Sequence, residues 1–335
     1  MPRRASCSGV SARKPPRPDA MPDSAPAAGP ADDLVLPFQL TGDGDGARLL
    51  GRLVRMGPLV DDVLGRHAYP EPVARLLAEA LALTATLAAT LKYDGVFTLQ
   101  AQGDGPVPLL VVDAESCNGR GYRLRGYARH DDARLAALGA APPATTRLFG
   151  TGWLAFTVDQ GGSTQRYQGI VEIAGDSLAE CAQHYFRQSQ QLDAAVLLAA
   201  GHGGEGWRAG GLILERIAAT GGRAPGSADG DDPWRRAMML LATSTVTELL
   251  DPWLAAERLL FRLFHAEGLR VNRPRPVERG CRCSEARIVD VLRRLPREDV
   301  AELAADGAIE VTCEFCSGVY RVDPGLLDRE EPGTP

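Results

Sequence analysis

Four of the chain's seven cysteines form two short pairs near the C-terminus, and this pattern constrains the fold more than any other feature. Cys281 and Cys283 are separated by one residue, Cys313 and Cys316 by two, and 29 residues lie between the pairs. Thiol pairs at these spacings are typical of a tetrahedral site in which four thiolates bind zinc. We therefore predict a four-cysteine site at these residues that holds one Zn²⁺ per reduced chain.

Structural disulfides are the competing interpretation of such pairs, and they need an oxidising compartment. The basic N-terminal residues are not followed by the apolar segment of a secretory signal peptide. Metal or redox chemistry is therefore favoured, and we expect a cytoplasmic protein. No apolar run reaches the length of about 18 residues that a membrane-spanning helix needs, so we expect no contact with a membrane.

The residues around the thiol pairs predict a small module that depends on its metal. Ser284 can cap a helix that runs to Leu295, and a second short helix is expected over 298–305. Alternating residues before Cys313 and the stretch Val319–Val322 predict two strands joined at the second thiol pair. About fifty residues bury little apolar surface, whereas structural zinc contributes on the order of 10–16 kcal/mol to folding. We therefore expect residues 281–330 to unfold without the metal.

Residues 33–220 predict a larger α+β domain. Pro72–Leu91 is apolar on nearly every face, as a core helix is, and a second helix is expected over Leu178–Gln190. Strands that alternate apolar and polar residues are expected in hairpins, with the helices kept apart. The expected strands are Leu34–Leu40, Ala47–Met56, Phe97–Ala101, Leu109–Val112, Tyr122–Ala128, Trp153–Val158, Arg166–Ile173, Ala194–Ala200 and Gly211–Ile217. Residues 1–32, rich in Pro, Ala and Ser, are expected to be a disordered tail.

Two short motifs resemble ligand sites but lack the required context. Asp43 and Asp45 alternate as in a calcium loop, but the other ligand positions are missing. Gly201–Gly206 has the GxGxxG spelling, but a strand-like run follows it instead of a phosphate-binding helix, so we expect a flexible hairpin loop. No nucleophile elbow or paired-carboxylate arrangement is present either. We therefore expect that the chain is not an enzyme.

Residues 221–280 predict a hinge followed by a helical linker. Gly221–Asp232 has the composition of a linker, and two helices are expected over Pro233–Leu250 and Pro252–His265. We expect these helices to dock on the large domain and to depend partly on the metal module. Five arginines then approach the first thiol pair. The large apolar residues of the helices include Trp234, Met238, Leu241, Leu249, Trp253, Phe261 and Phe264.

Many short segments, together with the thiol pattern, make the chain resemble the heat shock protein 33 family, the redox-regulated holdase chaperones of bacteria. The resemblance covers roughly residues 34–328. Its segments follow the family's order, so its specificity rests on many matches and not on one motif. They are Tyr69–Val73, Ala89–Gly95, Gln102–Pro106, Arg166–Gly169, Gly175–Asp176, Tyr185–Phe186, Ala209–Gly211, Arg262–His265 and Asp306–Gly307.

The resemblance implies an α+β core, a metastable helical linker and a zinc-binding redox switch. In the family the reduced, zinc-bound form is inactive, and oxidation releases zinc and unfolds the switch and the linker. The active form holds unfolding proteins without ATP. Carried over, the expected disulfides are Cys281–Cys283 and Cys313–Cys316, and the seven apolar linker residues are expected to bind clients. The expected partners are unfolding proteins, a second copy of the chain after oxidation, and ATP-dependent foldase chaperones.

Two alternative interpretations remain at this stage. A zinc-ribbon protein would use the arginines at 270–282 to contact nucleic acid. However, residues 281–335 contain 7 Arg and 12 Asp or Glu, a net charge of −5 that repels phosphate, and the whole chain carries −6. A structural zinc clip on an enzyme would leave the matched core segments unexplained. Cys7, Cys117 and Cys181 have no role in the predicted site and add thiols that could cross-link.

Overall fold

The computed structural model describes residues 33–42, 49–91, 93–139, 142–160, 166–190, 192–204, 206–217, 228–304 and 307–327. An eleven-stranded sheet dominates this part of the chain, with strand order β7-β6-β3-β4-β5-β11-β1-β2-β9-β8 and β10 paired to β1. The predicted tail at 1–32 with Cys7, and the Asp43/Asp45 turn, lie outside the described residues. No described helix is long and apolar enough to cross a membrane.

The strands predicted between residues 34 and 217 are confirmed, with ends that differ by a few residues. The strands at 96–103 and 122–129 alternate more and less buried side chains, as the sequence pattern predicts, whereas those at 49–56 and 206–216 are buried along most of their length. Their bounds are β1 Leu34–Leu40, β2 Leu49–Met56, β3 Val96–Gly103, β4 Leu109–Ser116, β5 Tyr122–Arg129, β6 Gly152–Asp159, β7 Tyr167–Glu172, β8 Ala194–Gly203 and β9 Gly206–Arg216.

The helices predicted over Pro72–Leu91 and Leu178–Gln190 are confirmed, the first with shorter bounds, and two short helices at 132–136 and 145–149 were not predicted. Short helices are α1 Pro58–Leu64, α3 Asp132–Ala136 and α4 Thr145–Phe149. Helix α5, Leu178–Tyr185, begins at Ser177, whose side chain accepts a hydrogen bond from the Glu180 N–H, and continues into a π-helical turn at Phe186–Gln190. The mixed α+β class predicted from the sequence is confirmed.

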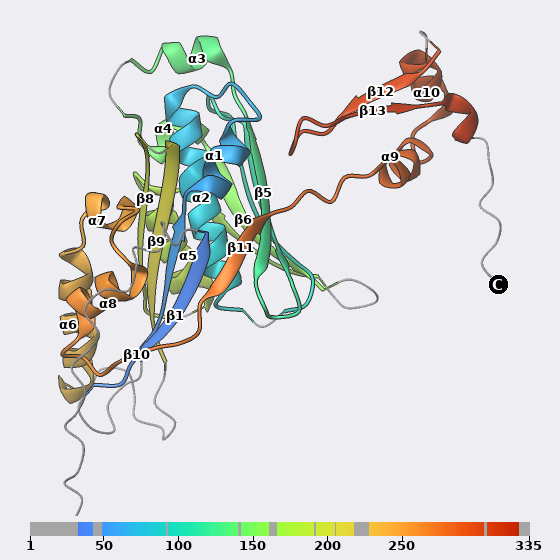
Figure 1. Ribbon diagram of the computed structural model, residues 1–335. Coiled ribbons are helices and arrows are strands. Elements are labelled where there is room, and N and C mark those ends of the chain that lie inside the picture. The colour runs from blue at the N-terminus through green and yellow to red at the C-terminus, as the bar shows by residue number, and fades with distance from the viewer. Residues whose placement is uncertain are drawn as a thin grey trace, which may run out of the picture.

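Helix α2, Glu71–Ala88, is the central core element, as its apolar sequence predicts. It packs against β2, β8 and β9 from one half of the sheet and against β3, β4 and β5 from the other half. Figure 1 shows it in the middle of the large domain, between these strands. The core helix thus holds the two halves of the bent sheet together.

The half-sheet β1-β2-β9-β8 is apolar on both faces, and its second face is covered by the linker helices (Figure 1). Leu36 and Phe38 of β1 and Leu212 of β9 belong to an apolar cluster with the helices α6 Ala228–Ala242, α7 Val246–Leu250 and α8 Ala256–Phe264. The predicted docking of the linker helices on the large domain is confirmed.

The predicted helix Pro233–Leu250 is wrong as a single helix. Thr245 begins α7 with a capping box, because its side chain accepts from the Glu248 N–H while the Glu248 carboxylate accepts from the Thr245 N–H. Helix α6 ends at Ala242, and the cap begins a separate helix at Val246. The predicted hinge also overlaps α6, which begins at Ala228, and the predicted helix from Pro252 begins only at Ala256.

Two strands follow the helices where the sequence predicted only a basic approach to the cysteines. β10, Leu269–Val271, pairs antiparallel with β1, and β11, Arg275–Arg279, pairs antiparallel with β1 and parallel with β5. β11 therefore closes the sheet between its two halves, with the Val277 side chain buried. The boundaries at 220 and 280 stay a prediction, although 269–279 contribute strands to the core sheet.

Gly201–Gly206 connects two strands of a hairpin, as the sequence predicted, but most of it is part of the strands and not of a loop. β8 continues through Gly203 and β9 begins at Gly206, so that His202 pairs with Trp207 and the connection is a tight turn. Gly206 has φ +94°, a conformation that favours glycine at this turn. The glycines therefore serve hairpin geometry.

The C-terminal module has the predicted elements. They are α9 Glu285–Leu292, α10 Arg297–Leu303, the hairpin of β12 Ile309–Thr312 and β13 Val319–Val322, and a 3₁₀ turn at Pro324–Leu326. Ser284 caps α9 by accepting from the Arg287 N–H. Leu292, Ile309 and Val322 are the three buried apolar residues of its described core. So small a core agrees with a module that needs a further stabilising element.

Candidate metal centre

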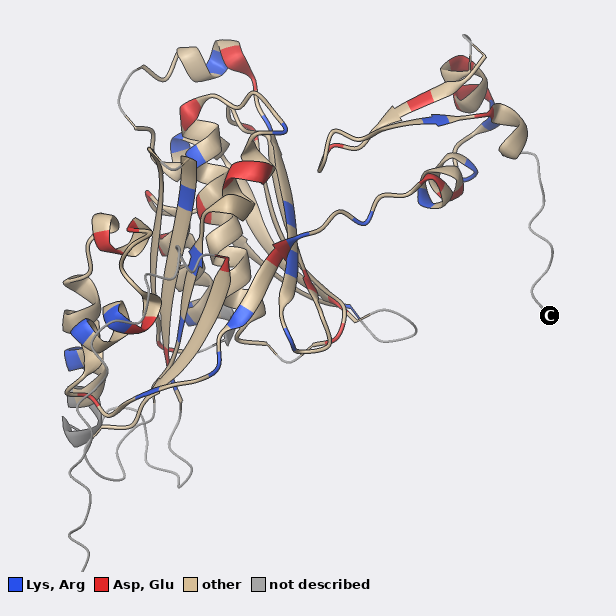
Figure 2. Ribbon diagram, in the orientation of Figure 1, with Lys and Arg blue, Asp and Glu red and all other residues tan. Residues whose placement is uncertain are grey.

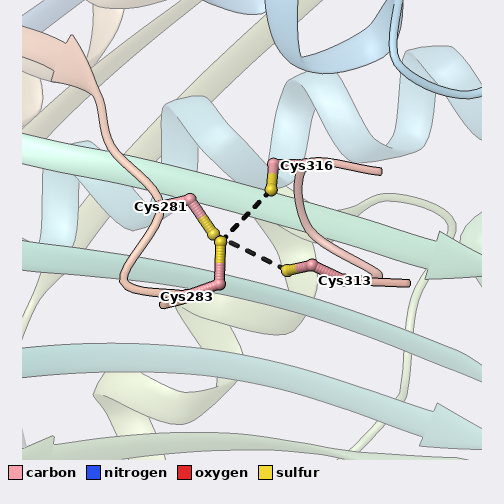
Figure 3. Close-up of side chains that lie close together, drawn as sticks. All are labelled: Cys281, Cys283, Cys313 and Cys316. Atoms are coloured by element: carbon pink, nitrogen blue, oxygen red, sulfur yellow. Dashed lines mark hydrogen bonds between the residues drawn. The ribbon is translucent and has the colours of Figure 1, made fainter. Parts of the chain in front are cut away.

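The four predicted cysteines come together in one cluster, two from each side of the module (Figure 3). Cys281 and Cys283 lie on the irregular segment between β11 and α9. Cys313 and Cys316 lie on the turn between β12 and β13. All four thiols are half-buried, and their sulfurs lie within 4.8 Å of one another. Among the described residues this is the one group of His, Cys, Asp and Glu that could hold a metal ion.

The turn between β12 and β13 has the backbone geometry that aims both of its thiols at one point. The Ser317 N–H donates to the Cys313 carbonyl at 2.8 Å, and the Cys313 N–H donates to the Gly318 carbonyl at 2.9 Å. Ser317 adopts φ +55°, and an added Cβ on Gly318 would lie 3.3 Å from the Cys316 Sγ. The tight turn thus leaves the sulfur atoms as the inward-facing groups.

The distances between sulfurs fit a single tetrahedral ion. Zinc–sulfur bonds of about 2.3 Å place tetrahedral thiolates about 3.8 Å apart. The Cys281 and Cys313 sulfurs are 3.7 Å apart, and the Cys283 and Cys316 sulfurs are 3.4 Å apart (Figure 3). Four thiols are also the donor set that zinc prefers over oxygen-binding cations. The residues therefore fit a metal of this kind, while the predicted pairing into disulfides stays a prediction.

The four thiols are not equivalent in acidity. Burial opposes ionisation of Cys281, but hydrogen bonds from the Cys283 backbone and side chain and from Arg125 lower its pKa to about 6. Burial raises the pKa of Cys313, and it raises that of Cys316 to about 12. Hydrogen bonding to Cys283 raises the pKa of Tyr320 to about 12, because its O–H donates to the Cys283 Sγ at 3.1 Å. Cys281 thus ionises more readily than Cys313 and Cys316, and thiolates are the species that bind metals and react with oxidants.

The turn between β12 and β13 contacts the large domain through β5. The Phe315 ring packs edge-on against Tyr127, with ring centroids 4.8 Å apart, and the Arg125 guanidinium lies 3.8 Å from its centroid. Arg129 pairs with Glu314 at 2.6 Å. In Figure 1 the β12–β13 hairpin points toward β5, and Figure 2 shows charged residues along β5 and β11. Polar and aromatic contacts therefore join module and core.

The residues at and just after the C-terminal end of α1 make a second contact with the same turn. Arg66 donates to the Cys316 carbonyl, and the Ser317 hydroxyl donates to the Arg66 carbonyl at 3.0 Å. Asp62 pairs with Arg66 and with Arg279 at the end of β11. Three of the five arginines in the predicted nucleic-acid approach are engaged within the chain, since Arg275 also donates to the Tyr122 hydroxyl.

The seven linker residues do not share one environment. Leu241, Leu249 and Phe264 are buried in the cluster with the half-sheet, and Trp234 and Met238 pack partly buried against it. Trp253 and Phe261 are 70% and 63% exposed. Phe38 of β1 stacks on Phe264 with centroids 5.7 Å apart. Five of the seven thus form a covered apolar surface, and their predicted role in client binding stays untested.

The remaining described cysteines do not join the cluster. Cys181 is buried, its S–H donates to the Ala174 carbonyl at 3.1 Å, and burial raises its pKa to about 11. Cys117 is half-buried on the loop between β4 and β5. The high pKa of Cys181 makes it a poor nucleophile, which reduces the expected cross-linking through this residue.

Sequence reasoning missed the residues that surround the thiols. Arg125, Asp113 and Tyr320 contact the cluster or its flanking residues, yet their spacing along the chain carries no metal-site signal. Only pairing of β4 with β5, and of β12 with β13, brings them there. The sequence signal that could have indicated them is charge at every second residue, Asp113 and Glu115 on β4 and Arg123 and Arg125 on β5. Such a pattern places the charges on one face of the sheet.

Known proteins resemble the chain over nearly its whole described length. The family model described as Hsp33 protein matches residues 42–323. The 33 kDa chaperonin of Caulobacter vibrioides is 43% identical over 311 residues, which cover 91% of this chain and 99% of that protein. The 33 kDa chaperonin of Pseudomonas fluorescens is 39% identical over 276 residues, covering 82% and 86%.

A solved structure supports the fold. The crystal structure of the heat shock protein 33 homologue from Thermotoga maritima aligns with a TM-score of 0.70 and 20% sequence identity, covering 88% of this chain and 97% of that one. At this identity the likeness concerns the fold alone.

Proposed function

Since this chain belongs to the Hsp33 family of chaperones, we propose that it is a redox-regulated, ATP-independent holdase that binds unfolding proteins under oxidative stress. The observation that carries the proposal is the convergence of four half-buried thiols on one point beside the core sheet. One site of this kind combines a sensor with a structural element, because the same sulfurs would react with oxidants and hold the module together.

In the reduced chain, Cys281, Cys283, Cys313 and Cys316 would hold Zn²⁺. When bound, the metal keeps sulfur in the thiolate form and contributes on the order of 10–16 kcal/mol to folding. The three buried apolar residues of the module cannot replace that contribution. The module therefore stays folded only while its four thiolates are available.

Oxidation by a peroxide would remove the ligands. One thiolate attacks the peroxide oxygen and becomes a sulfenic acid as water leaves, and the neighbouring thiol then displaces a second water to form the disulfide. Each disulfide thus consumes two thiols and one peroxide and yields two waters. We propose the pairs Cys281–Cys283 and Cys313–Cys316, which would leave no thiolate for the metal.

Unfolding of the module would then destabilise the linker. Gly280 alone separates β11 from Cys281, and β11 joins β1 to β5. Release of this strand and of β10 would free the C-terminal end of α8, whose apolar face covers the sheet. The uncovered cluster of helix and sheet residues would bind unfolding clients and favour dimers. We further propose a cytoplasmic location and hand-over of clients to ATP-dependent foldases.

A light-scattering assay of a thermally unfolding client tests the proposal. The reduced, zinc-loaded chain should leave aggregation unchanged, and the peroxide-treated chain should suppress it at near-equimolar ratio. A Cys117→Ser/Cys181→Ser double variant is the matched control, since it keeps the four-cysteine cluster and should switch normally. Equal suppression by the reduced and oxidised chains would refute redox control.

A further inference from the structure

Arg282, the residue between the first two cysteines, points into the core sheet. Its Nη2 donates to the Asp113 Oδ2 at 2.9 Å, and Asp113 lies on β4 with only 7% of its side chain exposed. The side chain that separates two thiols in the sequence is thus fastened to the large domain. A buried carboxylate strongly favours such charge-assisted hydrogen bonds.

Asp113 also holds Arg125, which reaches the second half of the cluster. The Arg125 Nε and Nη2 donate to Asp113 Oδ2 at 2.8 and 2.6 Å, and the Thr98 hydroxyl donates to Oδ1 at 2.6 Å. The same guanidinium lies over the Phe315 ring, and its Nη1 is 3.8 Å from the Cys281 Sγ. One carboxylate therefore connects to both thiol pairs through two arginines.

The charges of this group complement the cysteine cluster. Asp113 with two guanidiniums carries a net +1, whereas four thiolates around one divalent cation carry −2. Attraction across a half-buried contact of this kind is stronger than between exposed charges. Neutral disulfides without the cation would remove the negative partner. The contact is thus matched to the reduced cluster and not to its oxidised form.

We propose that Arg282, Asp113, Arg125 and Phe315 form a latch that fastens the reduced cysteine module to β4 and β5 and sets how readily the thiols are oxidised. The inference rests on the proposed redox switch and adds the contact that attaches the cysteine module to the core sheet. Arg282 and Asp113 are positioning residues: they would hold the cluster against the sheet and limit access to Cys281. Weakening the latch should therefore lower the oxidant exposure that the switch requires, while the metal stays bound.

Arg282→Met is the sharpest test, because Asp113 keeps Arg125 and Thr98 as partners and the core should stay folded. Arg321→Met is the matched control, since Arg321 lies in the module and pairs with Glu310 of β12 at 3.0 Å. Zinc content should be one per chain in both variants. Zinc release at a fixed peroxide concentration should be on the order of tenfold faster in Arg282→Met alone, as expected for loss of a charged hydrogen bond.

Amide exchange of the reduced, zinc-loaded chains gives a readout independent of activity. Residues 313–318 and 275–283 should exchange faster in Arg282→Met than in the wild type or the control. Arg282→Lys should recover most of the protection. In an Asp113→Asn background the effect of Arg282→Met should vanish, because its partner is already removed; Glu115→Gln on the same strand controls for charge loss.

Unchanged exchange and unchanged zinc release in zinc-loaded Arg282→Met would overturn the latch, and so would loss of zinc from the untreated variant, which would place Arg282 within the metal site. Failure of the oxidised wild type to protect a client would refute the proposed function instead. The exchange difference between Arg282→Met and its control would stand in that case, so the two failures are distinguishable.

Discussion

The linker helices and the cysteine module dock on the same sheet by opposite chemistry. On the β1-β2-β9-β8 half, α6 to α8 bury an apolar cluster in which Phe264 is fully covered and stacks on Phe38. On the β4–β5 side, the module is held by ion pairs, hydrogen bonds to Arg66 and one aromatic ring, Phe315. The first contact is built from apolar side chains, and the second is built mainly from charged and polar groups.

This difference indicates how the cysteine module can influence the linker helices. The apolar cluster of the helices contains no described residue beyond Leu269, so it includes no described side chain of the module. The covalent and hydrogen-bonded connection between them is β10 with β11. The sequence-based expectation that the helices depend partly on the module therefore requires these two short strands to transmit the change.

The largest effect is expected from removing a thiol ligand. Cys313→Ser leaves three thiolates, so zinc binding should weaken strongly and the module should lose most of its metal-linked stability, several kcal/mol. Metal analysis and amide exchange at β12 and β13 would measure both changes. Reduced Cys313→Ser should already suppress client aggregation in part, whereas Cys117→Ser should not. A zinc-free but inactive Cys313→Ser chain would separate metal loss from activity.

The apolar contact can be broken without touching the thiols. Phe264→Ala should lower the free energy of unfolding by about 3–5 kcal/mol, because it leaves a cavity beside Phe38. Phe261→Ala on the same helix is the matched control and should cost less than about 1 kcal/mol, since that ring is 63% exposed. Denaturant unfolding gives both values. Equal losses would mean that α8 is not docked through this face.

A half-buried carboxyl on the core helix gives a smaller, pH-dependent effect. Burial raises the pKa of Glu79 on α2 to about 7, with Arg75 opposing the shift. The pKa of Glu79 is therefore higher in the folded chain than the unfolded value near 4.5. Its contribution to the stability of the fold is fully present below about pH 4.5 and is lost as the pH rises through about 7. Glu79→Gln should therefore gain stability relative to wild type at pH 8, on the order of 2 kcal/mol, and little at pH 4. A pH-independent difference would contradict this assignment.

The smallest effect is expected from salt. A higher salt concentration should weaken the contact of the cysteine module with the sheet and leave the contact of the linker helices unchanged. The Debye length falls from about 10 Å at 0.1 M to about 3 Å at 1 M, which weakens exposed pairs such as Arg129–Glu314 by at most about 1 kcal/mol. Amide exchange at 313–318 should rise with salt in the reduced chain, while exchange in α8 should not. A parallel rise in both segments would show that the two contacts share one origin.

The cysteine cluster and most strands could be predicted because their signals are local. Thiol spacing, alternating apolar residues and the Ser284 cap each act within a few residues. β10 and β11 escaped prediction because Arg273, Pro274 and Pro276 break any local pattern, and the strands form only where β1 and β5 offer free edges. The position of Arg282 on Asp113 depends in turn on that pairing.

The sequence also could not predict which linker residues are covered. Its apolar residues correctly predicted docking on the core, yet they could not reveal that Trp253 and Phe261 face outward while Phe264 faces the sheet. Which residues are covered depends on the break at Thr245 and on the second apolar face of β1 and β2. Both features require knowledge of the whole sheet.

Amide exchange of the reduced, zinc-loaded chain against the oxidised, zinc-free chain tests the central claim most directly. The account predicts that residues 256–279, covering α8, β10 and β11, lose protection on oxidation, while residues 73–88 of α2 stay protected. The contrary result is full protection of 256–279 in a sample that is oxidised, free of zinc and active against a client. Activation would then bypass the linker, and β11 would not be the connection between thiols and chaperone surface.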